Sequence, residues 1–110
     1  MGNLTGRRGA AEVLVLALLD ARPRHGYELA LEIERRSEGV IDFHAASLYP
    51  LLYRIERQGL VAARWVEKPS ERRRRYYRLT PAGRRALAAE RQGWHRYLAA
   101  MQALLRPEEA

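Results

Sequence analysis

A chain of 110 residues has room for one domain with one hydrophobic core, and the absence of cysteine excludes both a disulfide framework and a thiolate metal site. Hydrophobic residues make up 47% and charged residues 30% of the chain, as in ordinary globular proteins, and the longest apolar run, residues 13–19, is too short to span a bilayer. We therefore expect a soluble, cytoplasmic protein with no membrane partner.

The positive charge is concentrated in one segment. Residues 64–85 contain nine arginine or lysine residues against two glutamates, a net of +7 that equals the formal net charge of the whole protein. The segment includes a run of four arginines: Arg72, Arg73, Arg74 and Arg75. A field confined to one segment most often attracts a polyanion, so the run predicts a contact with DNA, the alternative being a merely solvated turn.

The first predicted helix covers residues 10–21 and has no polar face between Val13 and Leu19. A helix that is apolar all round must be covered on all sides, and so short a chain has few segments to cover it. We therefore expect a second copy of the chain to cover part of this helix, in contact with Leu14 and Leu18. Pro23 ends the helix.

Two further helices are predicted over residues 25–36 and 45–58. The second helix has apolar residues at helical spacing and is expected to bury Tyr27 in the core. The third buries a stripe of four residues: Leu48, Leu51, Leu52 and Ile55. Its opposite face and flanks carry the residues that we expect to contact a partner: Ala46, Ser47, Tyr49, Pro50, Tyr53 and Arg54.

The pattern then changes to that of a hairpin followed by a long helix. Alternating residues predict a strand over 60–67, and after a turn the chain returns as a second strand over 75–79. Thr80 and Pro81 are typical of a helix start, as N-cap and first helical residue. The helix extends over residues 81–105, where Leu87, Trp94 and Met101 recur every seven residues. Such a seam on a terminal helix predicts dimerisation. The expected dimer interface contains Leu14, Leu18, Leu87, Trp94, Tyr97, Leu98, Met101 and Leu105.

Three helices, a hairpin and a trailing helix indicate a winged helix-turn-helix, a mainly α fold with a two-stranded β wing. Residues 1–80 are expected to form the DNA-binding domain and residues 81–110 a C-terminal dimerisation helix. In this fold class the third helix enters the major groove and the wing reaches the DNA backbone or the minor groove. The predicted DNA contacts are therefore Ala46, Ser47, Tyr49, Pro50, Tyr53, Arg54 and the arginine run 72–75.

Three stretches of the sequence, in this order, resemble the PadR family of bacterial transcriptional regulators. They are His25-Gly26-Tyr27-Glu28-Leu29, the segment 47–61 that begins Ser47-Leu48-Tyr49-Pro50, and the segment 73–83 that ends Leu79-Thr80-Pro81-Ala82-Gly83. The resemblance implies a homodimeric repressor that binds a double-stranded DNA operator, with a recognition-helix tyrosine in contact with DNA. The single long helix after the wing is similar to that of the short members of the family.

Trp94 has two interpretations. It is either a heptad residue that fills the dimer seam or part of a ligand site. The resemblance implies the second possibility, because some short members of the family bind flat aromatic compounds between their subunits, against a tryptophan of this helix. One Trp94 from each chain would then sandwich a planar aromatic effector by stacking.

The sequence offers nothing that predicts an enzyme. His25, His44 and His95 do not share a metal-ligand spacing, and there is no Ser-His-Asp order, phosphate-binding loop or carboxylate pair. We expect no metal and no cofactor. The alternative to a sequence-specific regulator is a nonspecific nucleic-acid-binding or architectural protein without an inducer.

Overall fold

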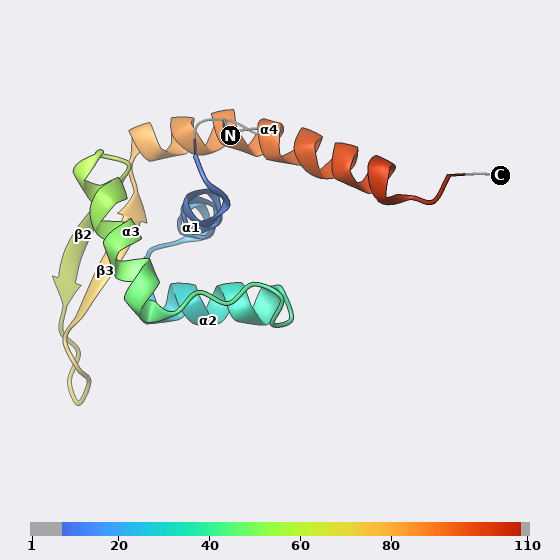
Figure 1. The fold of residues 1–110 in the computed structure, drawn as a ribbon. Helices are drawn as coiled ribbons and strands as arrows, with labels where there is room; N and C mark the ends of the chain where they lie inside the picture. Colours follow the sequence, from blue (N-terminus) through green and yellow to red (C-terminus); the bar gives the residue numbers. More distant parts are fainter. Residues whose placement is uncertain (1–7, 109–110) are drawn as a thin grey trace.

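The computed structural model describes residues 8–108, without the side chains of Ala45 and Ala46. Helix α1 (Ala10–Ala21) leads through a short strand β1 (Arg24–His25) into helices α2 (Gly26–Arg36) and α3 (Ala45–Arg57). Strands β2 (Val61–Val66) and β3 (Arg74–Leu79) form the wing, and helix α4 (Pro81–Leu105) follows. This mainly helical order with a small sheet confirms the predicted winged helix-turn-helix (Figure 1).

The sheet has three antiparallel strands in the order β1-β3-β2, where the sequence predicted two. Strand β2 pairs with β3 from Val61 opposite Leu79 to Val66 opposite Arg74. On the other edge of β3, Arg24 lies opposite Tyr77, so the residues just before α2 are joined to the wing. A strand of two residues is too short to show an alternating pattern, so sequence periodicity could not predict it.

Helix α1 is the centre of the core, with α4 on one side and α2 on the other (Figure 1). Val15 and Leu16 of this helix are completely buried. Most of the cover that the sequence assigned to a second chain comes from this chain itself. Leu18 is also buried, and between Val13 and Leu19 only Leu14 and Ala17 keep part of their surface open. The buried core is completed by Leu29, Ile33, Leu48, Leu51, Leu52, Ile55, Leu60, Val61, Tyr77, Leu79 and Leu87.

The start of α4 is fixed at the corner between α3 and β2. Thr80 is the N-cap that the sequence predicted, and its hydroxyl oxygen accepts a hydrogen bond of 3.0 Å from the Gly83 N–H. The same hydroxyl donates to the Gly59 carbonyl at 2.6 Å. A Cβ atom at Gly83 would lie 2.0 Å from the Leu60 carbonyl oxygen, so the helix can approach this closely only with glycine at that position.

The C-terminal half of α4 extends beyond the rest of the fold (Figure 1). Every residue from Leu98 to Glu108 is exposed, and the molecule is 65 Å long against 28 Å and 24 Å in the other directions. Four large apolar residues on this segment are exposed, Leu104 and Leu105 for most of their surface and the other two for about half of it: Leu98, Met101, Leu104 and Leu105. Within residues 8–108, no helix is both long and apolar enough to cross a membrane.

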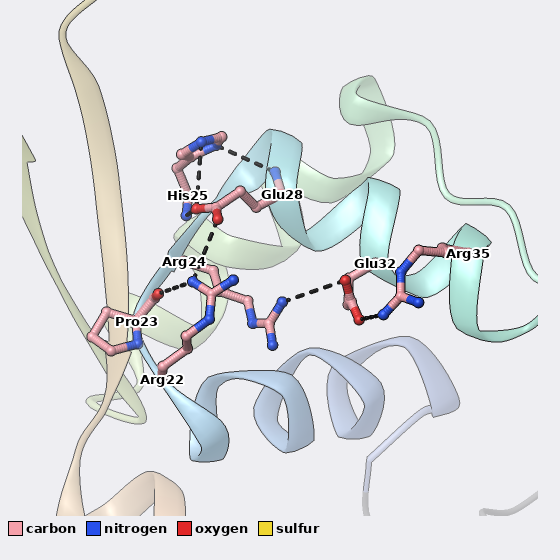
Figure 2. Close-up of polar contacts among 7 residues, drawn as sticks. All are labelled: Arg22, Pro23, Arg24, His25, Glu28, Glu32 and Arg35. Atoms are coloured by element: carbon pink, nitrogen blue, oxygen red, sulfur yellow. Dashed lines mark hydrogen bonds and ion pairs between the residues drawn. The ribbon is translucent and has the colours of Figure 1, made fainter.

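Helix α2 begins with a capping box in which histidine takes the usual place of serine or threonine (Figure 2). The His25 Nδ1 atom accepts a hydrogen bond of 3.3 Å from the Glu28 N–H, and the Glu28 carboxylate accepts one of 3.1 Å from the His25 N–H. Burial holds the pKa of His25 below its ordinary value; Glu28 opposes this effect, and Arg74 and Lys68 add to it. Only the neutral imidazole can accept the Glu28 N–H.

We expect Gly83→Ala to destabilise the protein by about 1–3 kcal/mol, because the added methyl group would collide with the fixed Leu60 carbonyl. Gly9→Ala is the matched control: nothing lies within 4 Å of a Cβ there, and the change at this N-cap should cost less than about 1 kcal/mol. Urea denaturation measures both values. Equal midpoints for the two variants would show that α4 does not need the close approach.

The free energy of unfolding should depend on pH through His25. Because the pKa in the folded protein lies below the ordinary value of 6.5, the folded state binds fewer protons than the unfolded state. The contribution of His25 is therefore present above pH 6.5 and is lost as the pH falls from there towards the lower folded pKa. His25→Asn keeps a capping side chain that does not titrate. Relative to this variant, the wild type should lose stability on acidification below pH 6.5, and a constant difference would contradict the cap.

Candidate nucleic-acid interface and a second cavity

The outer face of α3 carries the side chains that the sequence predicted to contact DNA. The stripe of Leu48, Leu51, Leu52 and Ile55 is buried as predicted. Ser47, Pro50 and Tyr53 are exposed on the other faces, and Tyr49 is half exposed. The side chain of Ala46 lies outside the described residues. Helix α3 therefore presents a small hydroxyl and two tyrosines to solvent along the first two turns.

The arginine run lies where the wing turns into β3. Arg72 and Arg73 are exposed in the turn, and Arg74 and Arg75 are partly exposed at the start of the strand. The Arg73 guanidinium stacks over the Trp65 ring, 4.6 Å from its centroid. This contact holds the long side chain against the wing without neutralising its charge.

Tyr27 lies beneath the neighbouring arginine rather than in the core, so the sequence-based prediction for this residue was wrong. Its side chain is 52% exposed, and the Arg74 guanidinium lies 5.9 Å from the ring centroid. Leu29 and Ile33 are the residues of α2 that face the core. Tyr27 precedes Leu29 by two residues, about 200° around the helix, and therefore faces away from the core.

The wing, α3 and the start of α2 enclose a cavity of about 420 Å³. Gly26, the first residue of α2, is in close contact with Tyr49 of α3, since a Cβ on Gly26 would lie 2.8 Å from the tyrosine ring. The fold thus brings together three stretches that are distant in the sequence. The cavity is lined by His25, Gly26, Tyr49, Trp65, Tyr77 and the arginines 72–75.

Two of the arginines predicted to contact DNA are bound to carboxylates that are at least partly buried in this chain. Arg75 contacts Glu56 of α3 at 2.8 Å, and Arg54 contacts Glu12 of α1 at 3.0 Å. Burial raises the pKa of Tyr77, which lies beside Arg75 on β3, so its hydroxyl is neutral at ordinary pH. Neither glutamate was among the residues that the sequence predicted to act at this surface. Glu12 had a visible signal, because a carboxylate directly before the apolar run 13–19 needs a cationic partner when it is buried with that run.

A second cavity, of about 300 Å³, lies between α1 and α4. Its lining is apolar except at the rim, where Arg91 and His95 lie. Trp94 forms part of the wall, and its buried ring Nε1–H has no hydrogen-bond acceptor among the described residues. The ring also contacts Tyr97 edge to face at 5.9 Å. The remaining lining residues are Ala10, Val13, Leu14, Ala17, Ile41, Leu87 and Leu98.

The residues expected at a dimer interface fall into three groups. Leu18 and Leu87 are buried in this chain's own core. Leu14 and Trp94 line the second cavity and are partly exposed, as is Tyr97, which contacts the Trp94 ring. The third group is exposed on the distal half of α4: Leu98, Met101 and Leu105. Among residues 8–108, no three histidine, cysteine, aspartate or glutamate side chains gather closely enough to hold a metal ion.

Comparison with known proteins gives a consistent result. The transcriptional regulator PadR-like family matches residues 15–89. A transcriptional regulator of Mycobacterium tuberculosis is 35% identical over 85 residues, which cover 77% of this chain and 76% of the relative. The crystal structure of a PadR family transcriptional regulator from Eggerthella lenta is 34% identical with a TM-score of 0.69, over 87% of this chain and 84% of that one.

The crystal structure of Bacillus subtilis PadR in complex with operator DNA has a TM-score of 0.65 and 17% identity, and covers 92% of this chain and 50% of that one. At this level of identity it shows the fold alone. The family match includes α2, α3, the wing and the first third of α4, well over half of the sequence. The chain therefore belongs to the PadR-like family of transcriptional regulators.

Proposed function

We propose that this protein is a cytoplasmic, homodimeric repressor that binds a specific DNA operator. The observation that carries the proposal is the convergence of α3 and the wing on one face. There Tyr49 borders the same cavity as the arginines 72–75. The surface combines hydroxyl groups, which can bond to base edges or phosphates, with guanidinium groups, which bind phosphate in a planar fork.

The two parts of this surface have different roles in the proposal. Arginines of the wing supply affinity that does not depend on sequence, because each neutralised phosphate releases counterions. Ser47, Tyr49, Pro50 and Tyr53 lie on α3, the helix that enters the major groove in this fold class, and supply base reading together with Ala46. The net charge outside residues 64–85 is zero, so the attraction is directed to the wing.

The proposed dimer is formed by the helix after the wing. The distal half of α4 exposes Leu98, Met101 and Leu105, which residues 8–108 cover only in part. A second copy that packs its own α4 against this segment and against Leu14 would bury these residues. The division proposed for the chain follows from this: residues 1–80 bind DNA and residues 81–110 hold the dimer.

The salt dependence of DNA binding tests the role of the wing. Changing Arg73 and Arg74 to alanine should weaken binding to operator and to scrambled DNA by similar factors. The negative slope of log K against log salt concentration should become less steep by about 1 for each phosphate that the variant no longer neutralises. Arg96→Ala, which removes a charge from an exposed position on α4, is the control and should leave the slope nearly unchanged. An unchanged slope in the wing variant would contradict the proposal.

Tyr49→Phe is the complementary variant for base reading. The operator is obtained by selecting from a random duplex pool with the wild-type protein. If the hydroxyl bonds to DNA, affinity for this duplex should fall by about 0.5–1.5 kcal/mol per subunit while the unfolding midpoint stays the same, because the side chain is half exposed. A wild-type protein that binds operator and scrambled duplex equally would instead be the architectural alternative.

We further propose that the cavity between α1 and α4 takes a planar aromatic effector. Its walls are almost entirely apolar, and Trp94 offers both a stacking surface and an N–H donor that the described residues leave unbonded. In a dimer formed through α4, the two Trp94 rings could stack on opposite faces of one ligand. Binding there would change the angle between the two DNA-reading units, because each unit is joined to α4 through the wing.

Fluorescence titration tests this second proposal. Planar aromatic dyes, neutral or cationic, should quench Trp94 emission with micromolar dissociation constants, about −8 kcal/mol. Trp94→Ala should abolish dye binding and leave the dimer intact by light scattering. Trp65→Phe, which removes the other tryptophan, is the control and should keep the full quenching. Undiminished dye binding by Trp94→Ala, or its dissociation into monomers, would make the residue purely structural.

A further inference from the structure

We propose that Glu12 is a positioning residue that keeps Arg54 of α3 from binding DNA phosphate and thereby lowers the sequence-independent part of the DNA affinity. The inference rests on the proposed DNA-binding function. It departs from the expectation that Arg54 itself contacts DNA. The structural basis is a carboxylate from the first turn of α1 that reaches α3 across 42 residues of sequence.

Both carboxylate oxygens of Glu12 are bound by arginine side chains. Its Oε1 atom accepts a hydrogen bond from Arg54 Nε at 3.1 Å and lies 3.0 Å from Arg54 Nη2. Its Oε2 atom accepts a bond of 3.1 Å from Arg8 Nη1, which also donates to the Gln58 side chain at 2.8 Å. Only 10% of the glutamate side chain is exposed. Two nitrogens of one guanidinium on one buried oxygen make a strong, geometrically specific contact.

Arg54 would otherwise be well placed to reach DNA. It lies four residues after Pro50, and residues at this spacing share one face of a helix. It also follows Tyr53 directly, on the helix whose outer face is proposed to read bases. Its side chain is 54% exposed in spite of the contact, so no steric barrier confines the guanidinium. The charge of Glu12 is what holds it towards α1.

The ion pairs of the wing show which of its arginines remain available to bind phosphate. Arg75 is held by Glu56, whose carboxylate is partly buried on α3. The carboxylate beside Arg73 is that of the exposed Glu67, at 3.7 Å, and Arg73 keeps its stacking contact with Trp65. Carboxylates inside the fold thus hold one arginine on α3 and one on the wing, whereas those at the wing turn can still bind phosphate.

Withholding a phosphate-binding arginine from α3 lowers the sequence-independent part of the DNA affinity. A phosphate contact strengthens binding to every duplex by the same factor, and genomic DNA offers a vast excess of competing sites. A guanidinium bound to Glu12 makes no such contact. Base-edge contacts by the remaining α3 side chains then account for a larger share of the total affinity. Glu12 therefore lowers binding to random DNA without touching the DNA itself.

Glu12→Gln tests the proposal on the selected operator duplex and on its scrambled permutation. The amide cannot hold the guanidinium by charge, so Arg54 becomes free to bind phosphate. Affinity for the scrambled duplex should rise, and the slope of log K against log salt should steepen by about 1 per subunit. When the salt concentration is reduced fourfold, the variant should gain about threefold more affinity per subunit than the wild type does. Affinity for the operator should rise by a similar factor, because a phosphate contact carries no sequence information.

The double variant Glu12→Gln with Arg54→Gln should return the slope to that of the wild type. Arg54→Gln alone should leave the slope unchanged, and circular dichroism confirms folding of each variant. If the slope becomes less steep by about 1 per subunit in Arg54→Gln, the inference is overturned, because the native arginine would then bind phosphate. Arg54→Gln alone tests whether the native arginine binds phosphate, even if Glu12→Gln does not fold. A wild-type protein that binds no duplex at all would instead remove the proposed DNA-binding function, and the inference with it.

Discussion

The burial of α1 is the constraint on which the rest of the structure depends. Val15 and Leu16 have no exposed surface, and each such side chain contributes about 1.5–3 kcal/mol to folding by leaving water. Helix α4 crosses one side of α1, and α2 with β3 closes the other (Figure 1). The wing and α3 are positioned by these contacts, since β3 leads directly into α4 through the Thr80 cap. A displacement of α1 would therefore alter every other element.

The same helix lies between the two proposed sites of the molecule. Leu14 and Ala17 line the cavity beside Trp94, while Glu12, at the beginning of the helix, holds Arg54 of α3. Rigid packed helices transmit small shifts because a core cannot deform continuously. A ligand that displaces α1 from α4 would move the Glu12 carboxylate with it. The proposed effector site and the proposed control of Arg54 are thus connected through one element.

Features set by neighbouring residues were predictable, and those set by distant partners were not. The bounds of α1, the cap at Thr80 and the buried stripe of α3 follow from local spacing and turn chemistry, and the structure confirms them. Strand β1 exists only because β3 pairs with it, and Tyr27 is exposed because the wing, not the core, faces the start of α2. The Glu12–Arg54 contact depends on how α1 crosses α3, a relation that helical periodicity does not contain.

The heptad residues of α4 show how one sequence pattern can serve three environments. Leu87 is buried in the core of its own chain, Trp94 forms the wall of a cavity, and Met101 is exposed beyond the rest of the fold. The pattern predicts a continuous dimer seam, but the first turns of α4 pack against α1 of the same chain. Only the distal turns, after Trp94, remain for a partner. Trp94 therefore lies at the boundary between intramolecular packing and the proposed dimer contact, beside the cavity that is the proposed site of a flat ligand.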